Sequence, residues 1–415
     1  MPDPRVSPGA SGSHAGDARH ATHLRSLNLD RVLSVAIDQK GTFTRADLSD
    51  ATGLSGPTVG SLAANLIRTG LITDLGTGRS RGGRKPSVME FNGRHGFVAG
   101  IDLGPTRTRL AIADLRADLV AHRIVPTPTQ LPPDGLLRFM ATALRTLARE
   151  HAVPYERIRV VTAGVPGPVN LESGTVAFAP NLPGWRDVAV LSILQSALDT
   201  TIVVENDVNL ALLGERWRGV ARGHDTCAFI FVGTGFGAAF LINGRLHHGH
   251  HYMAGEIGLM CMGTEFADVD VGSRGNLETL AGLDALRARW PDAKKEDPAH
   301  WVTDLMAAAD AGDAAAQRAV HDTARLIGIA VANVGTVVDP SIIVLGGAMF
   351  AQAPRLVELV RSVVHKQTRT SFDIVLSELG KEAPLAGCLL VASAEVRAQL
   401  RRQFGGTAGV ANVLA

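Results

Sequence analysis

Two short glycine turns constrain the fold of this 415-residue chain most, because each follows one apolar β-type run and precedes another. The first lies in "VAGIDLGPTRTRLAIADL" and the second in "TCAFIFVGTGFGAAFLINGRL". Around them, β-branched runs alternate with amphipathic helical segments from about residue 97 to residue 402, a pattern typical of α/β proteins. The repeated unit predicts two related lobes around a cleft large enough for a nucleotide.

The amino-terminal segment lacks this alternation. Residues 1–24 are rich in Pro, Ser, Gly, Ala and His without periodicity, which predicts a disordered tail. Apolar residues then recur at the spacing of one helix face, at Leu29, Val32, Leu33, Ala36 and Ile37. A first amphipathic helix is therefore expected after residue 24.

Two further helices and a hairpin are expected before residue 92. Thr44 is the predicted cap of a short helix that ends at Gly53, and Ser55 is the predicted cap of the next. Two short β-runs follow, joined by a tip rich in glycine and arginine. Three helices and a hairpin in this order predict a winged helix-turn-helix domain over residues 25–92. The third helix has its apolar face at Val59, Leu62, Ala63, Leu66 and Ile67.

The charge distribution favours nucleic-acid binding by this first domain. Residues 1–95 carry 12 Lys and Arg against 8 Asp and Glu, whereas the remainder carries 29 against 32. The alternative is a small helical interaction module whose arginines only keep a loop solvated. The side chains expected to face a major groove are Ser55, Thr58, Ser61 and Asn65. The wing residues expected to contact phosphates or a minor groove are Arg79, Arg81, Arg84 and Lys85.

Candidate ligand-binding residues lie near predicted strand ends in the α/β part. In "VVENDVNLALLGE", Asp207 follows an apolar strand and precedes a helix. An aspartate there either accepts a proton from a sugar hydroxyl that attacks phosphorus, or caps the helix. Asn181 and Glu256 offer further hydrogen bonds to a polyhydroxylated ligand, and Glu278 either joins them or opens the next helix.

The glycine-rich junctions are candidate phosphate and nucleotide sites. Glycine lets the backbone approach an anionic group closely, although a single glycine turn is most often only a tight turn. The residues expected at a nucleotide are Asp102, Gly104, Thr106, Gly233, Thr234, Gly235, Gly237, Gly346 and Gly347.

In this order the motifs resemble the ROK family (repressors, open reading frames, kinases), and specifically its repressors, over residues 26–402. "DLGPT" and "GTGFGAAFLINGRL" resemble its two phosphate motifs, "AGVPGPVN" and "APNLPGW" its sugar-lobe motifs, and "ENDVNLALLGE" its catalytic-base motif. The resemblance implies a two-lobed actin-like, ribonuclease-H-like sugar-kinase fold. Lobe 1 would span 97–206 with a closing helix at about 385–402, and lobe 2 would span 207–384. The resemblance implies Asp207 as the base and sugar contacts from Asn181, Asn206, Asp207, Glu256 and Glu278.

The family's structural zinc site is predicted to be lost. The family places one His and three Cys at positions that here are Leu259, Val269, Val271 and Asn276. Leu and Val cannot bind zinc, and because the family His also helps hold the sugar, Leu259 should alter ligand specificity. A replacement site built from "LHHGHHYM" and Cys261 is not favoured, because adjacent histidines cannot all face one ion. No metal is therefore expected.

Pro105 is the second departure, since the family usually has Gly there and proline has no N–H. ATP binding should be weakened, and no cofactor is required.

The leading prediction is a sugar-responsive repressor. It would bind double-stranded operator DNA as a homodimer or homotetramer, with a sugar or sugar phosphate as ligand. The alternative is an ATP-dependent hexose kinase that also binds DNA, with Asp207 as base and Mg-ATP as co-substrate. A third possibility is a DNA-binding protein whose α/β part only dimerises.

The sequence further predicts a cytoplasmic protein with no membrane partner. No apolar run approaches the roughly 18 to 20 residues of a membrane-spanning helix, and the polar N-terminus lacks the apolar core of a signal peptide. Cys227, Cys261 and Cys388 are scattered, which favours neither a disulfide framework nor a sequence-local zinc site.

Overall fold

A computed structural model of the chain describes residues 13–77, 87–233, 235–270, 275–290, 292, 300–369 and 371–403, with side chains from Leu24 onward. The chain forms two compact units. The N-terminal unit comprises the residues up to Phe97 together with 114–118 and the end of helix α13 (Ala383–Gln403) from Ser393 onward. The α/β unit comprises 98–113 and 119–392. None of the helices in these described ranges is both long enough and apolar enough to span a bilayer.

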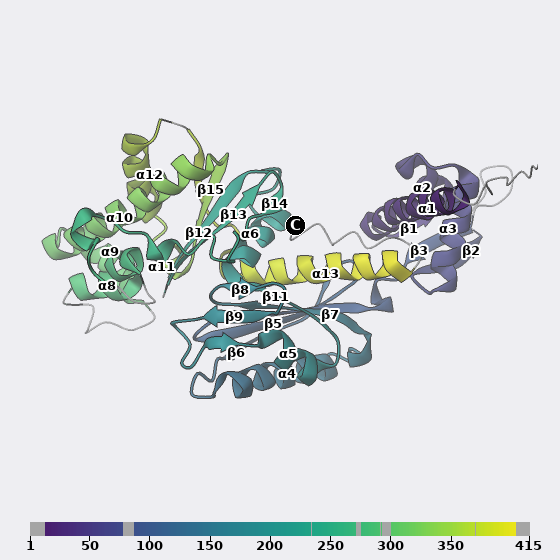
Figure 1. Ribbon diagram of the computed structural model, residues 1–415, viewed down its shortest axis with the longest axis horizontal. Coiled ribbons are helices and arrows are strands. Elements are labelled where there is room, and N and C mark those ends of the chain that lie inside the picture. The colour runs from purple at the N-terminus through teal and green to yellow at the C-terminus, as the bar shows by residue number, and fades with distance from the viewer. Residues whose placement is uncertain are drawn as a thin grey trace, which may run out of the picture. The chain divides into compact units, whose positions relative to one another are not determined.

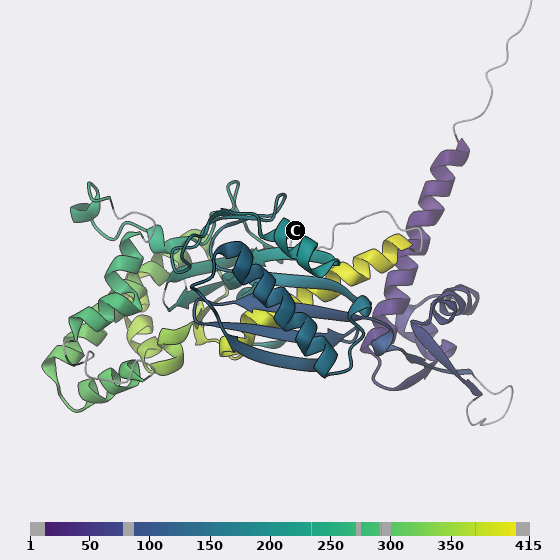
Figure 2. The same cartoon turned by 90° about the horizontal axis from the view of Figure 1, so that it is seen from below.

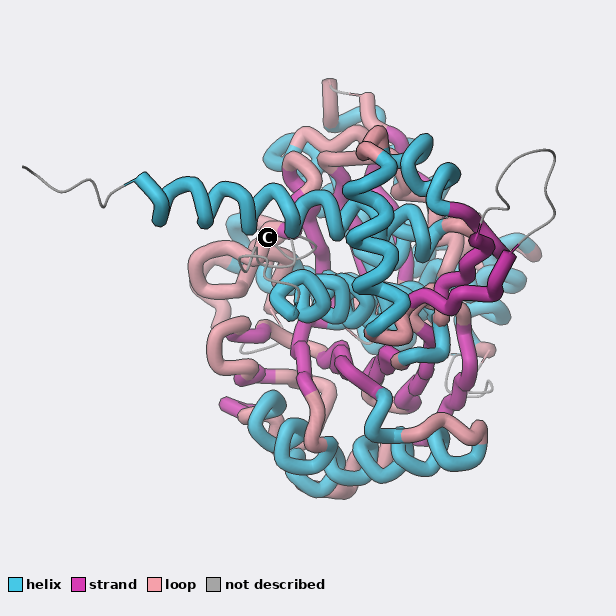
Figure 3. The backbone as a smooth tube through the Cα atoms, turned by 90° about the vertical axis from the view of Figure 1, so that its right-hand side faces the viewer, coloured by secondary structure: helices cyan, strands magenta, loops and turns pink. Residues whose placement is uncertain are grey.

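The N-terminal unit has the predicted three helices and hairpin, which Figure 3 shows as helices in cyan beside strands in magenta. Thr44 and Asp47 form a capping box at α2, because each side chain accepts a hydrogen bond from the other's backbone N–H. Gly53 ends α2 in the left-handed region at φ 70°, and Ser55 caps α3. The elements are α1 (Ser13–Asp38), α2 (Arg45–Thr52) and α3 (Gly56–Arg68), with β1 (Thr42–Thr44), β2 (Ile72–Thr77) and β3 (Ser87–Phe91) as an antiparallel sheet in the order β1-β3-β2.

The predicted apolar faces of α1 and α3 form the core of this unit. All five predicted residues of α1 are buried, and of those on α3 only Ile67 is half-buried. The prediction of a disordered tail through residue 24 is wrong from Ser13 onward, because α1 begins there. The segment 13–24 contains no proline and several alanines, so it can extend the helix that follows. Residues 1–12 lie outside the described ranges.

The turn at 114–118 belongs to the N-terminal unit although it connects two strands of the α/β unit. Its Arg116 donates hydrogen bonds to the backbone carbonyls of Ile37, Gln39 and Phe91 at 2.8–3.0 Å, and stacks over the ring of Phe91. This contact satisfies the carbonyls at the end of α1 and was not foreseen from the sequence.

The α/β unit contains two five-stranded sheets of equivalent topology, which confirms the prediction of two related lobes (Figure 1). The orders are β11-β7-β4-β5-β6 and β16-β15-β12-β13-β14. In each sheet the first two strands are parallel and the last two antiparallel. The strands of the first sheet are β4 (Phe97–Leu103), β5 (Arg107–Asp114), β6 (Leu119–Pro126), β7 (Ile158–Val165) and β11 (Thr201–Asn206). Those of the second are β12 (Cys227–Val232), β13 (Phe236–Ile242), β14 (Arg245–Leu246), β15 (Ile342–Gly346) and β16 (Asp373–Leu376).

Helices cover both sheets. In Figure 2, α4 (Pro133–Glu150) lies across a face of the first sheet, and α5 (Val190–Leu198) packs on α4 and β11. The first lobe also carries a small sheet of β8 (Val169–Asn170), β9 (Thr175–Phe178) and β10 (Arg186–Val188). One face of the second sheet packs against α6 (Asp207–Arg218) and α13. The other face shares a core with α7 (Asn276–Ala281), α8 (Leu283–Arg289), α9 (Trp301–Asp310), α10 (Ala314–Val338), α11 (Ala348–Gln352) and α12 (Leu356–Gln367).

The two glycine turns occupy equivalent positions, since one joins β4 to β5 and the other joins β12 to β13. A Cβ on Gly104 would lie 2.8 Å from the carbonyl oxygen of Arg107, so the first turn requires glycine for close approach of its own backbone. The repeat that the sequence shows is therefore a repeat of strand–turn–strand units in two sheets.

Candidate ligand-binding cleft

Two adjoining pockets form a cleft in the α/β unit and share Pro105, Asp207 and Phe231. We call the first pocket the sugar end, because it contains the predicted sugar-binding residues, and the second the nucleotide end. All five predicted sugar residues line the sugar end: Asn181, Asn206, Asp207, Glu256 and Glu278. They come from the segment after β9, from the β11–α6 junction, from the loop before the short helix η3 (Ile257–Leu259) and from α7.

The junction of β11 and α6 orients Asp207 toward the cleft. Asn206 is the helix cap, because its Oδ1 accepts hydrogen bonds from the backbone N–H groups of Val208 and Asn209. Its Nδ2 donates to the carbonyl of Gly167 at 3.0 Å. The capping role considered for Asp207 thus belongs to its neighbour. Burial raises the pKa of Asp207 to about 8, with smaller contributions from the charges of Asp102 and Glu256.

Glu256 and Glu278 are the other two carboxyl side chains that line the sugar end. Burial, together with the charge of Glu278, raises the pKa of Glu256 to about 7. Glu278 lies in the first turn of α7, and its Oε2 accepts a hydrogen bond from the backbone N–H of Phe236 at 3.2 Å. Gly235 passes between this carboxyl and Asn181, where a Cβ would lie 3.3 Å and 3.2 Å from their polar atoms. The second glycine turn thus lets the backbone pass between two polar side chains at the sugar end.

Several residues of the sugar end were not predicted. Phe178, Phe231 and Phe236 supply apolar surface, and Gly167 lies beside Phe178. Behind the pocket, buried Glu205 accepts hydrogen bonds from His248 Nε2 at 2.8 Å and from Asn209 Nδ2 at 2.9 Å. Their sequence signal was present: Gly167 is in the quoted "AGVPGPVN", Glu205 directly precedes Asn206, and His248 belongs to the histidine run.

The predicted nucleotide residues do not all reach the nucleotide end. Asp102, Gly104, Thr106 and Gly347 line it, whereas Gly235 and Gly237 line the sugar end. Gly233 and Gly346 line neither pocket. A Cβ at either position would meet an aromatic ring, that of Phe231 or of Phe229 respectively. The prediction that Gly346 lies beneath a nucleotide stays a prediction, and Thr234 lies outside the described residues.

Both glycine turns use backbone donors within themselves. The N–H of Gly104 donates to the carbonyl of Arg107 at 3.1 Å, and that of Gly233 donates to the carbonyl of Gly235 at 3.0 Å. The carbonyl of Gly104 accepts from Thr127 Oγ1 at 2.8 Å. Since Pro105 has no N–H, the first turn offers a phosphate two donors fewer than an open glycine turn.

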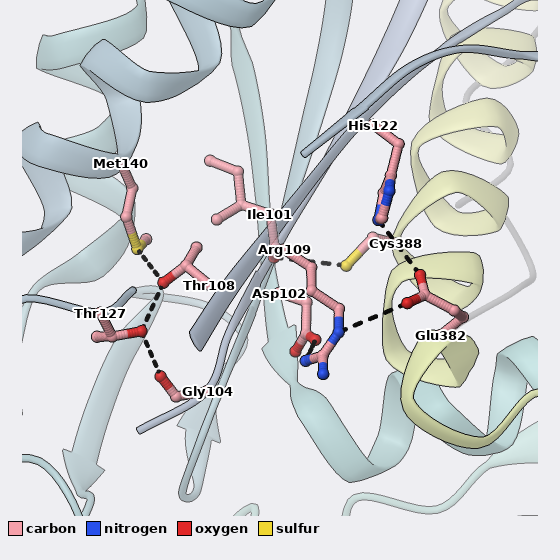
Figure 4. A network of polar contacts seen from close by, with 10 residues as sticks. All are labelled: Ile101, Asp102, Gly104, Thr108, Arg109, His122, Thr127, Met140, Glu382 and Cys388. Carbon is pink, nitrogen blue, oxygen red and sulfur yellow. Dashed lines mark hydrogen bonds and ion pairs between the residues drawn. The ribbon is translucent and has the colours of Figure 1, made fainter. Parts of the chain in front are cut away.

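Asp102 and Arg109 line the nucleotide end and belong to a polar network that extends to Glu382 and His122 (Figure 4). Arg109 Nη1 lies 3.2 Å from Asp102 Oδ2, and Arg109 Nε lies 3.6 Å from Glu382 Oε1. His122 Nε2 lies 3.4 Å from the other carboxylate oxygen of Glu382. Burial raises the pKa of Asp102 to about 6 although Arg109 opposes this, so the carboxyl is mostly ionised and paired at neutral pH.

The four positions that the resemblance assigns to zinc ligands are occupied by Leu259, Val269, Val271 and Asn276. Leu259 is 42% exposed and lines the sugar end, and Val269 is 52% exposed. Asn276 is buried, and its Oδ1 accepts a hydrogen bond from the N–H of Met262 at 2.8 Å, which ties the two ends of this loop together. Val271 lies outside the described residues. His248 pairs with Glu205 and Cys261 contacts the carbonyl of Gly263. Within the described ranges, no group of three or more His, Cys, Asp or Glu could hold a metal ion.

The candidate DNA-contacting face lies on α3 of the N-terminal unit. Ser61 is exposed, and Asn65 Oδ1 accepts from Arg68 Nη2 at 3.0 Å. Ser55 caps the helix through the N–H of Thr58, and the two hydroxyls lie 2.8 Å apart. The wing residues Arg79, Arg81, Arg84 and Lys85 all lie outside the described ranges.

A two-lobed sugar-kinase-like body with an acidic cleft, preceded by a winged helix-turn-helix unit, defines the class of this protein. The chain belongs to the ROK family, whose family model matches residues 98–395. It is 26% identical over 387 residues to the xylose repressor of Caldicellulosiruptor bescii, and this alignment covers 89% of this chain and 96% of the repressor. It is 30% identical over 278 residues to the glucokinase of Halalkalibacterium halodurans, covering 64% of this chain and 84% of the enzyme.

The fold matches solved structures of the same family. The crystal structure of a ROK family transcriptional regulator, a homolog of the E. coli MLC protein, aligns with a TM-score of 0.73 at 23% identity. That alignment covers 92% of this chain and 99% of the regulator. A kinase-type body with an added N-terminal unit is therefore an architecture already seen in this family.

Proposed function

We propose that this protein is a transcriptional repressor that binds operator DNA through its winged helix-turn-helix unit and responds to a sugar in the cleft. The observation that carries the proposal is the extent of the alignments. The xylose repressor matches 89% of the chain, so the match must include much of the N-terminal unit, whereas the glucokinase matches 64%. In this proposal residues 25–92 are the DNA-binding domain, and 97–206 with the closing helix and 207–384 are the two lobes.

The sugar end suits a polyhydroxylated ligand. Carboxyl and amide groups from four separate segments face one pocket, and the neighbouring aromatic rings supply apolar surface. The proposed sugar contacts are Asn181, Asn206, Asp207, Glu256 and Glu278. Xylose is the first sugar to test because relatives are xylose repressors, and glucose is the second because other relatives are glucokinases.

A sugar can change DNA binding only if it binds the conformation that binds the operator and the conformation that does not with different affinities.

The proposed assembly is a homodimer or homotetramer on a palindromic operator, in the cytoplasm where the DNA is. Ser55, Thr58, Ser61 and Asn65 are the proposed groove contacts, and Arg79, Arg81, Arg84 and Lys85 the proposed wing contacts. Neutralising Arg81 and Arg84 together should weaken binding to all sequences and lower its salt dependence.

The test begins with the full chain and a pool of random double-stranded DNA, from which bound fragments are selected. The Kd for a selected fragment is then measured by fluorescence anisotropy with xylose, glucose, N-acetylhexosamines and their phosphates. One of these should change the Kd by about tenfold. Glu256→Gln should remove the response and keep DNA affinity, whereas Glu172→Gln, an exposed carboxylate outside the cleft, should keep both. If no sugar changes the Kd, the sensor half of the proposal fails.

A second candidate is an ATP-dependent hexose kinase that also binds DNA. Asp207 favours it, because this carboxyl is not the helix cap and its raised pKa suits a group that accepts a proton. Asp207→Ala distinguishes the two proposals. A kinase would lose sugar-dependent release of ADP with little change in sugar affinity, whereas a sensor releases no ADP and loses only sugar affinity.

A further inference from the structure

Arg109 places a permanent positive charge inside the nucleotide end. It lies in β5, a strand whose residues after it are buried, and its own side chain is only 14% exposed. Arginine is the side chain that proteins use for a fixed positive charge. Its nearest partners are the carboxyls of Asp102 and Glu382, at 3.2 Å and 3.6 Å.

Asp102 is the carboxylate that this turn could offer to a divalent cation. Mg²⁺ prefers carboxylate and phosphate oxygens at close range. Here one oxygen of Asp102 is already hydrogen-bonded to Arg109, and a cation placed beside it would meet the guanidinium at short distance. The turn itself has lost donors at Gly104 and Pro105. The residues present therefore do not fit a metal–nucleotide complex.

The pocket itself is not closed. It has a volume of about 270 Å³, and Arg107 and Lys381 line it together with Arg109. Size alone therefore does not exclude a ligand from this end. The feature that sets it apart from a metal–nucleotide site is its charge, because Arg109 is paired with Asp102, and Arg107 and Lys381 add two further cationic side chains to the lining.

We propose that Arg109 is a specificity-determining residue that takes the place of a divalent cation at Asp102. Through it the nucleotide end of the cleft excludes the metal–nucleotide complex. The inference deepens the proposed function, in which the cleft belongs to a sensor and not to a kinase, and rests on it to that extent. Its test, however, needs neither a known sugar nor an operator.

The experiment measures binding of ATP to the full chain by calorimetry, with Mg²⁺ and with EDTA. Wild-type protein should show no Mg²⁺-dependent gain in affinity. Arg109→Met, which removes the charge and keeps the aliphatic bulk, should bind Mg-ATP about tenfold more tightly than wild type. Arg109→Lys should behave as wild type, because it restores the charge. Arg149→Ala is the matched control, an exposed arginine on α4 that lines neither pocket, and should also behave as wild type.

Two results would overturn the inference. Wild-type protein that binds Mg-ATP more tightly than ATP alone, with the gain lost in Arg109→Met, would make Arg109 a phosphate ligand. No gain in Arg109→Met, with its thermal unfolding midpoint near that of wild type, would show that the charge is not the determinant. If Arg109→Met unfolds, Arg109→Gln is measured by the same criteria. If no sugar changes operator affinity, the proposed function is wrong, but the nucleotide-binding results still test the role of Arg109.

Discussion

The two ends of the cleft use their polar groups in opposite ways. At the sugar end, no ion pair within the described part of the chain involves Asp207 or Glu256, and burial raises the pKa of both carboxyls. At the nucleotide end, Asp102 is paired with Arg109, and the N–H and the carbonyl of Gly104 are both hydrogen-bonded within the protein. A buried group without a charge partner destabilises the fold but stays available to a ligand. The polar groups of the nucleotide end therefore bond largely to one another, whereas two buried carboxyls of the sugar end have no ion-pair partner in the described part of the chain.

The largest expected effect comes from the backbone that shapes the sugar end. Gly167 has φ 88°, and a Cβ there would overlap the carbonyl oxygen of Phe178. Gly167→Ala should lower the free energy of unfolding by about 3 kcal/mol and abolish stabilisation by sugar, because Asn206 bonds to the carbonyl of Gly167. Chemical denaturation with and without sugar measures both effects.

Gly223→Ala is the control for this substitution, since Gly223 has φ 86° and no atom within 4 Å of an added Cβ. It should cost only about 1 kcal/mol and leave sugar binding intact. Equal losses in the two variants would show that the φ angle, and not the contact with Phe178, determines the cost.

Most of this architecture was predictable because local signals repeat. The strand–turn–strand units, the cap at Thr44 and the apolar faces of α1 and α3 each depend on residues close in sequence. The five predicted sugar residues line one pocket because each lies close to the end of a strand or in a loop, and these strand ends and loops surround the same pocket. Their individual roles stay predictions.

Arg109 and Arg116 could not be assigned in the same way. In sequence, Arg107 and Arg109 alternate with Thr106 and Thr108, which is equally typical of a solvent-facing strand edge. The partner Glu382 follows far along the chain, next to α13, and the carbonyls that Arg116 reaches come from α1 and β3. A sequence pattern does not contain such pairings, because they depend on how distant elements pack.

Removing one carboxyl from each end should raise the free energy of unfolding, and by less where the carboxyl is paired. Asp102→Asn should raise it by only about 0.5 kcal/mol at pH 8, because Arg109 opposes the burial that raises the pKa of Asp102 to about 6. Asp207→Asn should raise it by about 1 kcal/mol at pH 8, because from about pH 4 to pH 8 the folded wild-type protein keeps a proton that the unfolded chain has released.

The sign follows from proton binding. Between the ordinary pKa near 4 and the raised pKa of about 8, the folded state holds a proton that the unfolded chain has released. Wild-type stability therefore falls as pH rises across this window, and Asp207→Asn should fall less steeply. Denaturation at a series of pH values from 5 to 8 measures the two slopes, with Glu172→Gln as the exposed control. Parallel slopes for Asp207→Asn and wild type would contradict the account.

The smallest effect tests whether the two ends are mechanically separate. Buried Thr127 donates to the carbonyl of Gly104 at 2.8 Å and its hydroxyl lies 3.0 Å from that of Thr108. Thr127→Val keeps the shape and removes both contacts, so the free energy of unfolding should fall by about 0.5 to 1 kcal/mol. Sugar affinity should not change, because these bonds fix only the turn at the nucleotide end.

Thr142→Val is the control. It removes a hydroxyl that bonds within α4 on the exposed surface, and it should change neither quantity measurably. A fall in sugar affinity in Thr127→Val alone would mean that the first turn positions Asp207 through Pro105. The nucleotide end would then still act in sugar binding, as a support for the sugar end.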